Sequence, residues 1–72
     1  MELNKWIDEV GGYPEAAVLL GENPRTVYSW YRMERVPSFL AAVNIIRVSG
    51  RKVDFNGIYY PVVRKRFAEE FK

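Results

Sequence analysis

The sequence predicts a compact, mostly α-helical domain with five helices, or with four helices and a short C-terminal β-hairpin. The chain has 72 residues, the size of one small domain. Apolar residues recur at helical spacing in several segments, and glycines and an Asn-Pro pair separate those segments. We expect residues 1–50 to form a helical core and residues 51–72 to extend the same domain as a hairpin, a helix or both.

The first predicted helix has a single apolar face. Its apolar residues follow the i, i+3, i+4, i+7 spacing of an amphipathic helix. They are Leu3, Trp6, Ile7 and Val10. The glycines at positions 11 and 12 end this helix, because glycine adopts the left-handed conformation of a helix C-terminus at little cost.

Two short helices are predicted next, joined by about three residues. Pro14 suits the first turn of the second helix, which runs about two turns until Gly21 stops it. Asn23 is a good N-cap and Pro24 a good first residue for the third helix, which reaches position 32 or 33.

A fourth helix is predicted from about Pro37 or Ser38 to the Ser-Gly pair at 49–50. We expect it to direct Phe39, Leu40, Val43 and Ile46 inward. A second apolar stripe on this helix is left over, and it could support the C-terminal segment or a second subunit. That stripe consists of Ala41, Ile45 and Val48.

The predicted core combines the apolar faces of these four helices. Its members are Trp6, Ile7, Ala17, Leu20, Val27, Trp30, Leu40, Val43 and Ile46.

The composition excludes several kinds of chemistry. The chain has no cysteine and no histidine, so disulfides, the usual zinc sites, thiol nucleophiles and imidazole catalysis are all absent. The serines at 29, 38 and 49 therefore have no histidine to activate them. We expect a protein that is not an enzyme and has no cofactor or metal.

The sequence also favours a cytoplasmic protein. The longest uncharged apolar stretch, residues 36–46, is shorter than the ~20 residues that span a bilayer. The first residues are acidic and do not resemble a secretion signal. We therefore expect no membrane partner.

Charge is distributed unevenly along the chain. Residues 1–24 hold one basic and five acidic residues, a net charge of −4, whereas residues 25–72 hold ten basic and four acidic residues, a net charge of +6. The basic part begins at Arg25, inside the predicted third helix. A modest basic excess in a small domain more often reflects solubility than nucleic-acid binding, so charge alone leaves both interpretations open.

The second and third helices have the spacing of a helix-turn-helix, in which the second helix of the pair enters the DNA major groove. Ala17 is small where the two helices approach, Gly21 lies at the turn, and Val27 and Trp30 face the core. On a helical wheel the opposite face of the third helix is polar. It carries Arg25, Tyr28, Ser29 and Arg32.

The sequence resembles the small repressor-type helix-turn-helix regulators of the Cro and CI kind from phages and bacteria. The resemblance covers about residues 11–50 and is carried by "EAAVLLGENPRTVYSW" and "RVPSFLAAVNIIRVSG". The later "GRKVDFNGIYYP" looks like the tail of short prophage regulators. One departure is Glu22, which stands where such proteins usually have an apolar residue.

The resemblance implies a Cro/CI-like fold and a sequence-specific regulator, repressor-like, that binds a palindromic double-stranded DNA operator. It implies a bacterial or phage-infected host cell, with the protein on the nucleoid. Tyr13 matches a backbone-contact position of the family and holds a phosphate, or instead its ring closes the junction of the first two helices.

The predicted base-contacting groups lie at the N-terminal end of the third helix, because a guanidinium can bond guanine bidentately and a hydroxyl can bond base edges. Arg32, one turn later, and Arg35, just after the helix, are predicted to contact phosphate. The full predicted DNA-binding set is Tyr13, Asn23, Arg25, Thr26, Tyr28, Ser29, Arg32 and Arg35. The alternative is an ordinary polar helix surface. Asn44, Arg47, Arg51 and Lys52 are expected to be a solvated face rather than contacts.

The C-terminal segment has two interpretations. Asn56-Gly57 lies between two alternating segments and is a strong hairpin signal, with an irregular loop over 53–60 as the rival. Pro61 then opens a last helix with Val63, Phe67 and Phe71 on one face. Because one recognition helix contacts few base pairs, we expect a weak homodimer that tightens on DNA, with contacts from residues after position 50.

Two other function classes stay open. An excisionase-type factor that bends DNA would share the small size, the helix-turn-helix and a hairpin that acts as a wing, but the fourth helix argues against it. A protein-binding antitoxin or adaptor would use the C-terminal aromatic residues.

Overall fold

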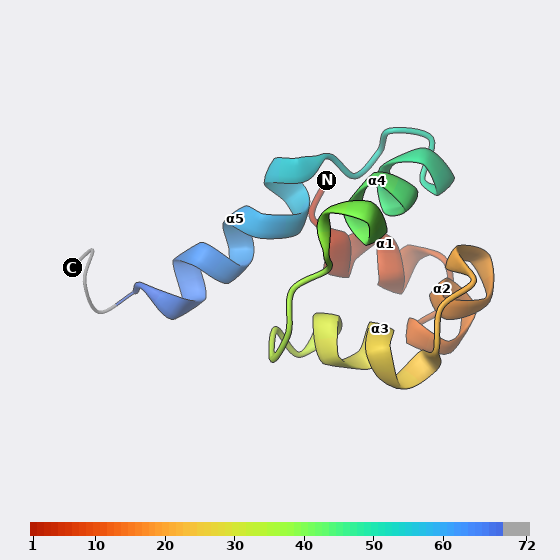
Figure 1. Ribbon diagram of the computed structural model, residues 1–72, viewed down its shortest axis with the longest axis horizontal. Helices are drawn as coiled ribbons and strands as arrows, with labels where there is room; N and C mark the ends of the chain where they lie inside the picture. Colours follow the sequence, from red (N-terminus) through yellow and green to blue (C-terminus); the bar gives the residue numbers. More distant parts are fainter. Residues whose placement is uncertain (69–72) are drawn as a thin grey trace.

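The computed structural model describes residues 1–68, and over these residues the chain forms five α-helices and no β-strand (Figure 1). The helices are α1 (Leu3–Glu9), α2 (Tyr13–Leu20), α3 (Pro24–Tyr31), α4 (Phe39–Val48) and α5 (Phe55–Arg66). The prediction of a mostly helical fold is confirmed, in its five-helix form. None of the helices within residues 1–68 is long and apolar enough to cross a bilayer.

The first three helices form where the sequence places them. Gly21 adopts the left-handed conformation, with φ 67° and ψ 32°, and ends α2. The Asn23 side chain accepts a hydrogen bond from the Arg25 backbone N–H at 2.8 Å, which caps α3. A cap of this kind stabilises a helix by about 1 kcal/mol. The connection between α2 and α3 is therefore short and fixed at both ends.

The core lies between α1, α2 and α3 and is closed by α4 and the start of α5. All six core residues predicted in α1–α3 are buried: Trp6, Ile7, Ala17, Leu20, Val27 and Trp30. Val53 and Ile58, from the segment after α4, belong to the same buried cluster. Helices α2 and α3 form the most extensive contact between two helices of residues 1–68, and the small residue Ala17 is buried.

The predicted orientation of α4 is wrong. Ala42 and Ile45 are its buried residues, whereas Leu40 is 78% exposed and Val43 is 41% exposed. The stripe of Ala41, Ile45 and Val48, predicted to be left over, is the side that packs on the core, with Ile46 partly buried beside it. Periodicity could not choose between the faces, because α4 is apolar almost all around.

The predicted hairpin over 53–60 is also wrong, and so is the rival irregular loop. Asp54 caps α5 by accepting a hydrogen bond from the Gly57 backbone N–H at 2.7 Å, and the helix continues through Pro61. Pro61 therefore lies inside the last helix instead of opening it. Ile58 and Val62, one turn apart, are buried as helical spacing requires.

Gly57 serves packing rather than a turn. A Cβ at this position would lie 2.1 Å from the Met1 carbonyl oxygen, so the first turn of α5 contacts the start of the chain only because a hydrogen replaces a side chain. The Met1 ammonium group donates to the Lys52 carbonyl at 2.6 Å in the same region. Figure 1 shows the N-terminus beside the beginning of α5, which then leads away from the other helices.

The later part of α5 leaves some apolar side chains in solvent. Val63 and Phe67 are 40% and 41% exposed. Phe71, predicted on the same face, lies outside the described residues.

Candidate nucleic-acid interface

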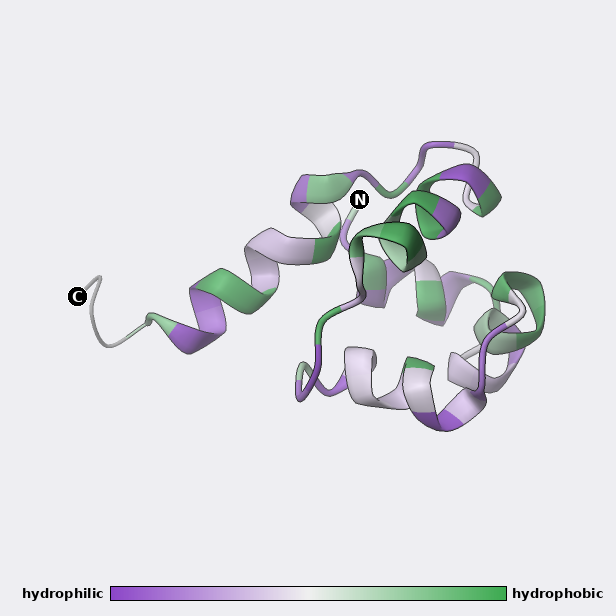
Figure 2. Cartoon of the chain, in the orientation of Figure 1, coloured by the Kyte–Doolittle hydropathy of each residue, from purple (hydrophilic) through white to green (hydrophobic). Residues whose placement is uncertain are grey.

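Helix α3 has two opposed faces, as the helical wheel predicts. Val27 and Trp30 are buried against the other helices, and Arg25, Tyr28 and Arg32 are exposed on the opposite side. Figure 2 shows α3 mostly pale to purple, whereas α4 is largely green. A helix with one buried apolar stripe projects its other face from the body.

Two hydrogen bonds join the C-terminal end of α3 to α1. Tyr31 is half-buried, and its hydroxyl donates a hydrogen bond to the Asp8 carboxylate at 2.8 Å. This hydrogen bond raises the pKa of Tyr31 above the ordinary tyrosine value. Asn4 of α1 donates to the Tyr31 carbonyl at 2.9 Å. Helix α1 thus holds the orientation of α3.

A shallow groove runs along the N-terminal half of α3. It is lined by Asn23, Arg25, Thr26, Ser29 and Arg35. Five of the eight predicted DNA-binding residues therefore lie together. The Ser29 hydroxyl donates to the Thr26 carbonyl at 2.6 Å, so its oxygen can still accept a hydrogen bond.

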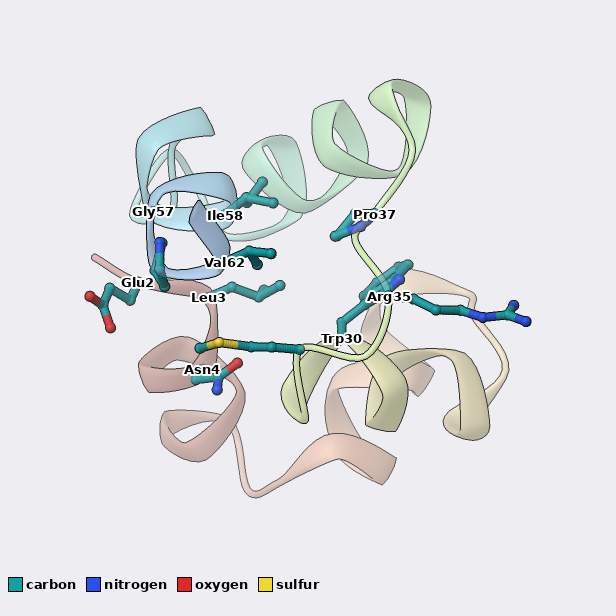
Figure 3. Close-up of a pocket in the computed structure, with 11 residues that line it drawn as sticks. Glu2, Leu3, Asn4, Trp30, Arg35, Pro37, Gly57, Ile58 and Val62 are labelled. Atoms are coloured by element: carbon teal, nitrogen blue, oxygen red, sulfur yellow. The ribbon is translucent and has the colours of Figure 1, made fainter. Parts of the chain in front are cut away.

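The two arginines of this groove have uncommitted guanidinium groups. Neither Arg25 nor Arg35 makes a side-chain hydrogen bond or ion pair with any residue between 1 and 68. Figure 3 shows the Arg35 side chain pointing away from the cavity drawn there. An unpaired guanidinium keeps all five N–H donors for an external acceptor, which suits bidentate binding of phosphate or guanine.

The other three predicted residues form a cluster on the opposite flank of α3, in which the Tyr13 and Tyr28 rings are tilted by 52°. The rings of Tyr13 and Tyr28 lie 4.9 Å apart, and the Arg32 guanidinium lies 5.8 Å from the centre of the Tyr28 ring. Arg32 donates to the Tyr28 hydroxyl at 3.3 Å. Tyr13 therefore contacts α3 and does not simply close the junction of α1 and α2.

Arg32 differs from the two groove arginines because it has partners inside the chain. Glu34 lies 3.9 Å from its Nε, and both side chains are exposed. The hydrogen bond with Tyr28, together with Glu34, raises the pKa of Arg32. The guanidinium stays charged, but a phosphate that binds it must compete with a carboxylate.

Three of the four residues expected to form a solvated face have side-chain partners. Asn44 donates to the Leu20 carbonyl at the end of α2 at 3.0 Å, and Arg47 donates to Asn44 at 2.7 Å. Lys52 pairs with Glu9 at 3.8 Å. Asn44 thus links α4 to α2, and a role in packing explains it.

Sequence reasoning missed one contact to the end of α3. The Lys65 ammonium group donates to the Arg32 carbonyl at 3.1 Å, so α5 supplies a cation at the C-terminus of α3. A cation there is favourable because of the helix dipole. Only the correct helical assignment of residues 55–66 brings Lys65 to this position, and no local pattern indicated it.

A small, partly open cavity lies between α1, α5 and the end of α3 (Figure 3). It is lined mostly by apolar groups, among them Leu3, Trp30, Ile58 and Val62. Its volume of about 10 Å³ is close to that of one water molecule, so it is a packing gap rather than a cofactor site. No group of three or more metal-binding side chains occurs within residues 1–68.

Comparisons of the chain with protein families, with curated proteins and with solved structures found no match.

Proposed function

We propose that this chain is a sequence-specific double-stranded DNA-binding protein that inserts α3 into the major groove. The observation that carries the proposal is the groove beside α3, where Arg25 in the first turn of the helix and Arg35 after its end have no side-chain partner within residues 1–68. The Ser29 hydroxyl and the Asn23 amide line the same groove. These groups match the donors and acceptors of base edges and phosphates. The proposed arrangement is a Cro/CI-like helix-turn-helix in which α2 lies across the phosphate backbone of the DNA.

In this proposal the two flanks of α3 have separate tasks. Arg25 and Ser29, one turn apart near the N-terminus of α3, bond base edges. Arg35 binds a phosphate on the groove side, and the cluster of Tyr13, Tyr28 and Arg32 contacts the DNA backbone on the other side. The caps of α3 support this, because a helix that is held rigidly at both ends loses little further freedom on binding.

The biological role that we propose is transcriptional regulation, repressor-like, at a palindromic operator in a bacterial or phage-infected cell. The excisionase alternative loses its main support, since residues 53–60 contain no hairpin to act as a wing. An adaptor function has only the exposed apolar side chains in its favour.

Binding to a fluorescent random-sequence duplex, measured by anisotropy across salt concentrations, tests the proposal. We expect log affinity to fall linearly with log salt, with a slope of about −0.9 for each phosphate that the protein neutralises. Arg35→Ala should reduce that slope by about one unit.

Arg51→Asn is the matched control, because it removes an exposed cation from the α4–α5 connection, which Figure 1 places on the other side of the molecule from α3. Asparagine tolerates the positive φ of 67° at this position. Absence of any salt-dependent binding by the folded parent protein would overturn the proposed function.

A further inference from the structure

The last part of α5 extends beyond the core. The buried residues of α5 end with Val62, and every residue from 63 to 68 is exposed. Figure 1 shows this part of α5 leading away from the other helices. Most of the stability of a helix in a protein comes from packing of its apolar face. Core packing therefore does not account for the last turn of α5, and its surface is available to a partner.

This exposed end of α5 is strongly basic. Residues 55–68 hold no acidic residue and three cations, which are consecutive at positions 64–66. Figure 2 shows a hydrophilic, purple segment in the last turn of α5. The next acidic residues, at positions 69 and 70, lie outside the described residues. The helix dipole favours cations at this end, but three on one turn also repel one another, and a bound anion relieves that repulsion.

Lys65 places the basic end of α5 next to the C-terminal end of α3. Its ammonium group donates one of three N–H bonds to the Arg32 carbonyl at 3.1 Å, so two remain for an external acceptor. Arg66 is exposed and has no hydrogen-bond or ion-pair partner within residues 1–68. We define the α5 basic end as Lys65 and Arg66.

Arg66 lies on the side of α5 that faces the connection between α3 and α4. It follows Tyr59 by seven residues, so the two share one side of the helix. The Tyr59 hydroxyl donates to the Pro37 carbonyl of that connection at 2.9 Å. The same connection carries Arg35, one of the two groove arginines. The α5 basic end therefore belongs to the surface around the end of α3.

We propose that the α5 basic end is a second DNA contact, in which Lys65 and Arg66 bind phosphates beyond the C-terminal end of α3. This inference rests on the proposed function, because it takes the duplex to lie along α3. The α3 backbone rises by roughly 10 Å between Arg25 and Arg32. Successive phosphates of one strand are about 3.4 Å apart along the duplex axis, so the α5 contact lies about three base pairs from the base contacts of Arg25.

Phosphate contacts of this kind add affinity and fix the position of the protein on the duplex, but carry no base preference. The variant Arg66→Gln tests the contact in the full chain, since glutamine is a good helix former and α5 is retained. Anisotropy titrations of random-sequence duplex across salt concentrations should show a slope smaller by about 0.9. That slope corresponds to about eightfold weaker binding at about 0.1 M salt. An unchanged slope would overturn the inference.

Arg64→Gln is the matched control, because it removes the same charge from the same turn of α5. Arg64 lies roughly 160° around the helix from Arg66. It pairs with Glu2, and its guanidinium lies 5.1 Å from the centre of the Tyr60 ring. Its replacement should change the slope much less than Arg66→Gln does. Equal effects of the two variants would show a response to net charge alone and overturn the inference.

An acidic protein is the rival partner for the α5 basic end. Poly-glutamate should displace duplex from the parent protein only weakly, because a guanidinium binds the closely spaced oxygens of a phosphate with better geometry than a flexible chain of carboxylates. Displacement as effective as that by unlabelled duplex at equal charge concentration would assign the site to acidic polymers in general and overturn the inference.

Phosphate ethylation interference separates this inference from the proposed function. On a duplex selected by the parent, ethylation of the outermost contacted phosphates should weaken binding of the parent but not of Arg66→Gln, with the other positions unchanged. Identical patterns would overturn the α5 contact alone. Binding of random duplex that depends on Arg66 but not on Arg25 or Arg35 would remove the insertion of α3 and keep the α5 contact. Absence of duplex binding by the parent would overturn both.

Discussion

Replacement of Gly57 by alanine sets two physical effects against each other. In a helix interior, alanine is more favourable than glycine by about 0.5–1 kcal/mol. The added Cβ, however, would lie 2.1 Å from the Met1 carbonyl oxygen and 3.0 Å from the Met1 carbonyl carbon. Overpacking against backbone typically costs about 1–3 kcal/mol.

The clash should therefore exceed the gain in helix propensity. We expect Gly57→Ala to lower the free energy of unfolding by about 1 kcal/mol, the difference between the midpoints of the two ranges. In a domain of this size that corresponds to a decrease in melting temperature of roughly 4–8 °C. Thermal unfolding followed by far-UV circular dichroism at 222 nm, together with urea titration, measures both quantities.

Asn56→Ala is the control that distinguishes a helix from a hairpin. Asn56 is exposed in the first turn of α5, so alanine should leave the melting temperature unchanged or raise it slightly. In a type I′ hairpin the same change would destabilise, because position 56 would need a positive φ. A Gly57→Ala protein that melts at or above the parent temperature would refute the close approach between α5 and Met1.

Other predictions concern the core, the pH dependence and the cations. Trp30→Ala should lower the free energy of unfolding by about 3–5 kcal/mol, because it removes a large buried side chain. A urea midpoint equal to that of the parent would contradict the place of Trp30 in the core. Tyr31 has a raised pKa through its hydrogen bond to Asp8, so its stabilising effect is present below pH 10 and is lost as the pH rises through the folded-state pKa. Melting temperatures should decline above about pH 10, less steeply in Tyr31→Phe, and identical profiles would argue against this hydrogen bond. Arg35→Ala should weaken random-duplex binding more than Arg32→Ala does, because the Arg32 side chain is already paired with Glu34. The reverse order would show that the Arg32–Glu34 pair opens on DNA.

The first three helices could be predicted because their boundaries are encoded locally. Gly21 ends α2 by its left-handed conformation, and Asn23 and Pro24 start α3 through a cap and a fixed φ. The division of α3 into two faces followed from helical periodicity alone. These signals act over three or four residues, so they do not depend on the rest of the fold.

The orientation of α4 and the conformation of residues 55–66 could not be predicted in this way. Helix α4 has apolar residues on both sides, and the choice between them depends on which side meets the core. In the sequence, a glycine at position 57 is compatible with a hairpin turn and equally with a helix that packs closely against a distant part of the backbone. Only the position of Met1, more than fifty residues earlier in the chain, decides between these roles.

The sequence could predict which residues line the candidate groove, but not which of the arginines have hydrogen-bond or ion-pair partners within the protein. The groove brings together Asn23, Arg25, Thr26, Ser29 and Arg35, all of which lie near one another in the sequence. The structure adds that Arg25 and Arg35 have no side-chain partner among residues 1–68, whereas Arg32 is engaged by Tyr28 and Glu34. That difference depends on rotamers and on the turn after α3, which composition does not encode.

The most direct test of the central claim, that α3 contacts base edges in the major groove, is the ratio of specific to random-duplex affinity for Arg25→Ala. The specific duplex would come from selection by the parent protein out of a random pool, and anisotropy titrations at one fixed salt concentration would give both affinities. We predict that Arg25→Ala loses about 1–3 kcal/mol on the selected duplex and relaxes the preference at one base pair, while its affinity for random duplex falls much less. Both proteins must melt near the same temperature, which the exposed position of Arg25 favours. An equal loss on the two duplexes would show that Arg25 contacts phosphate and would contradict base recognition by this end of α3.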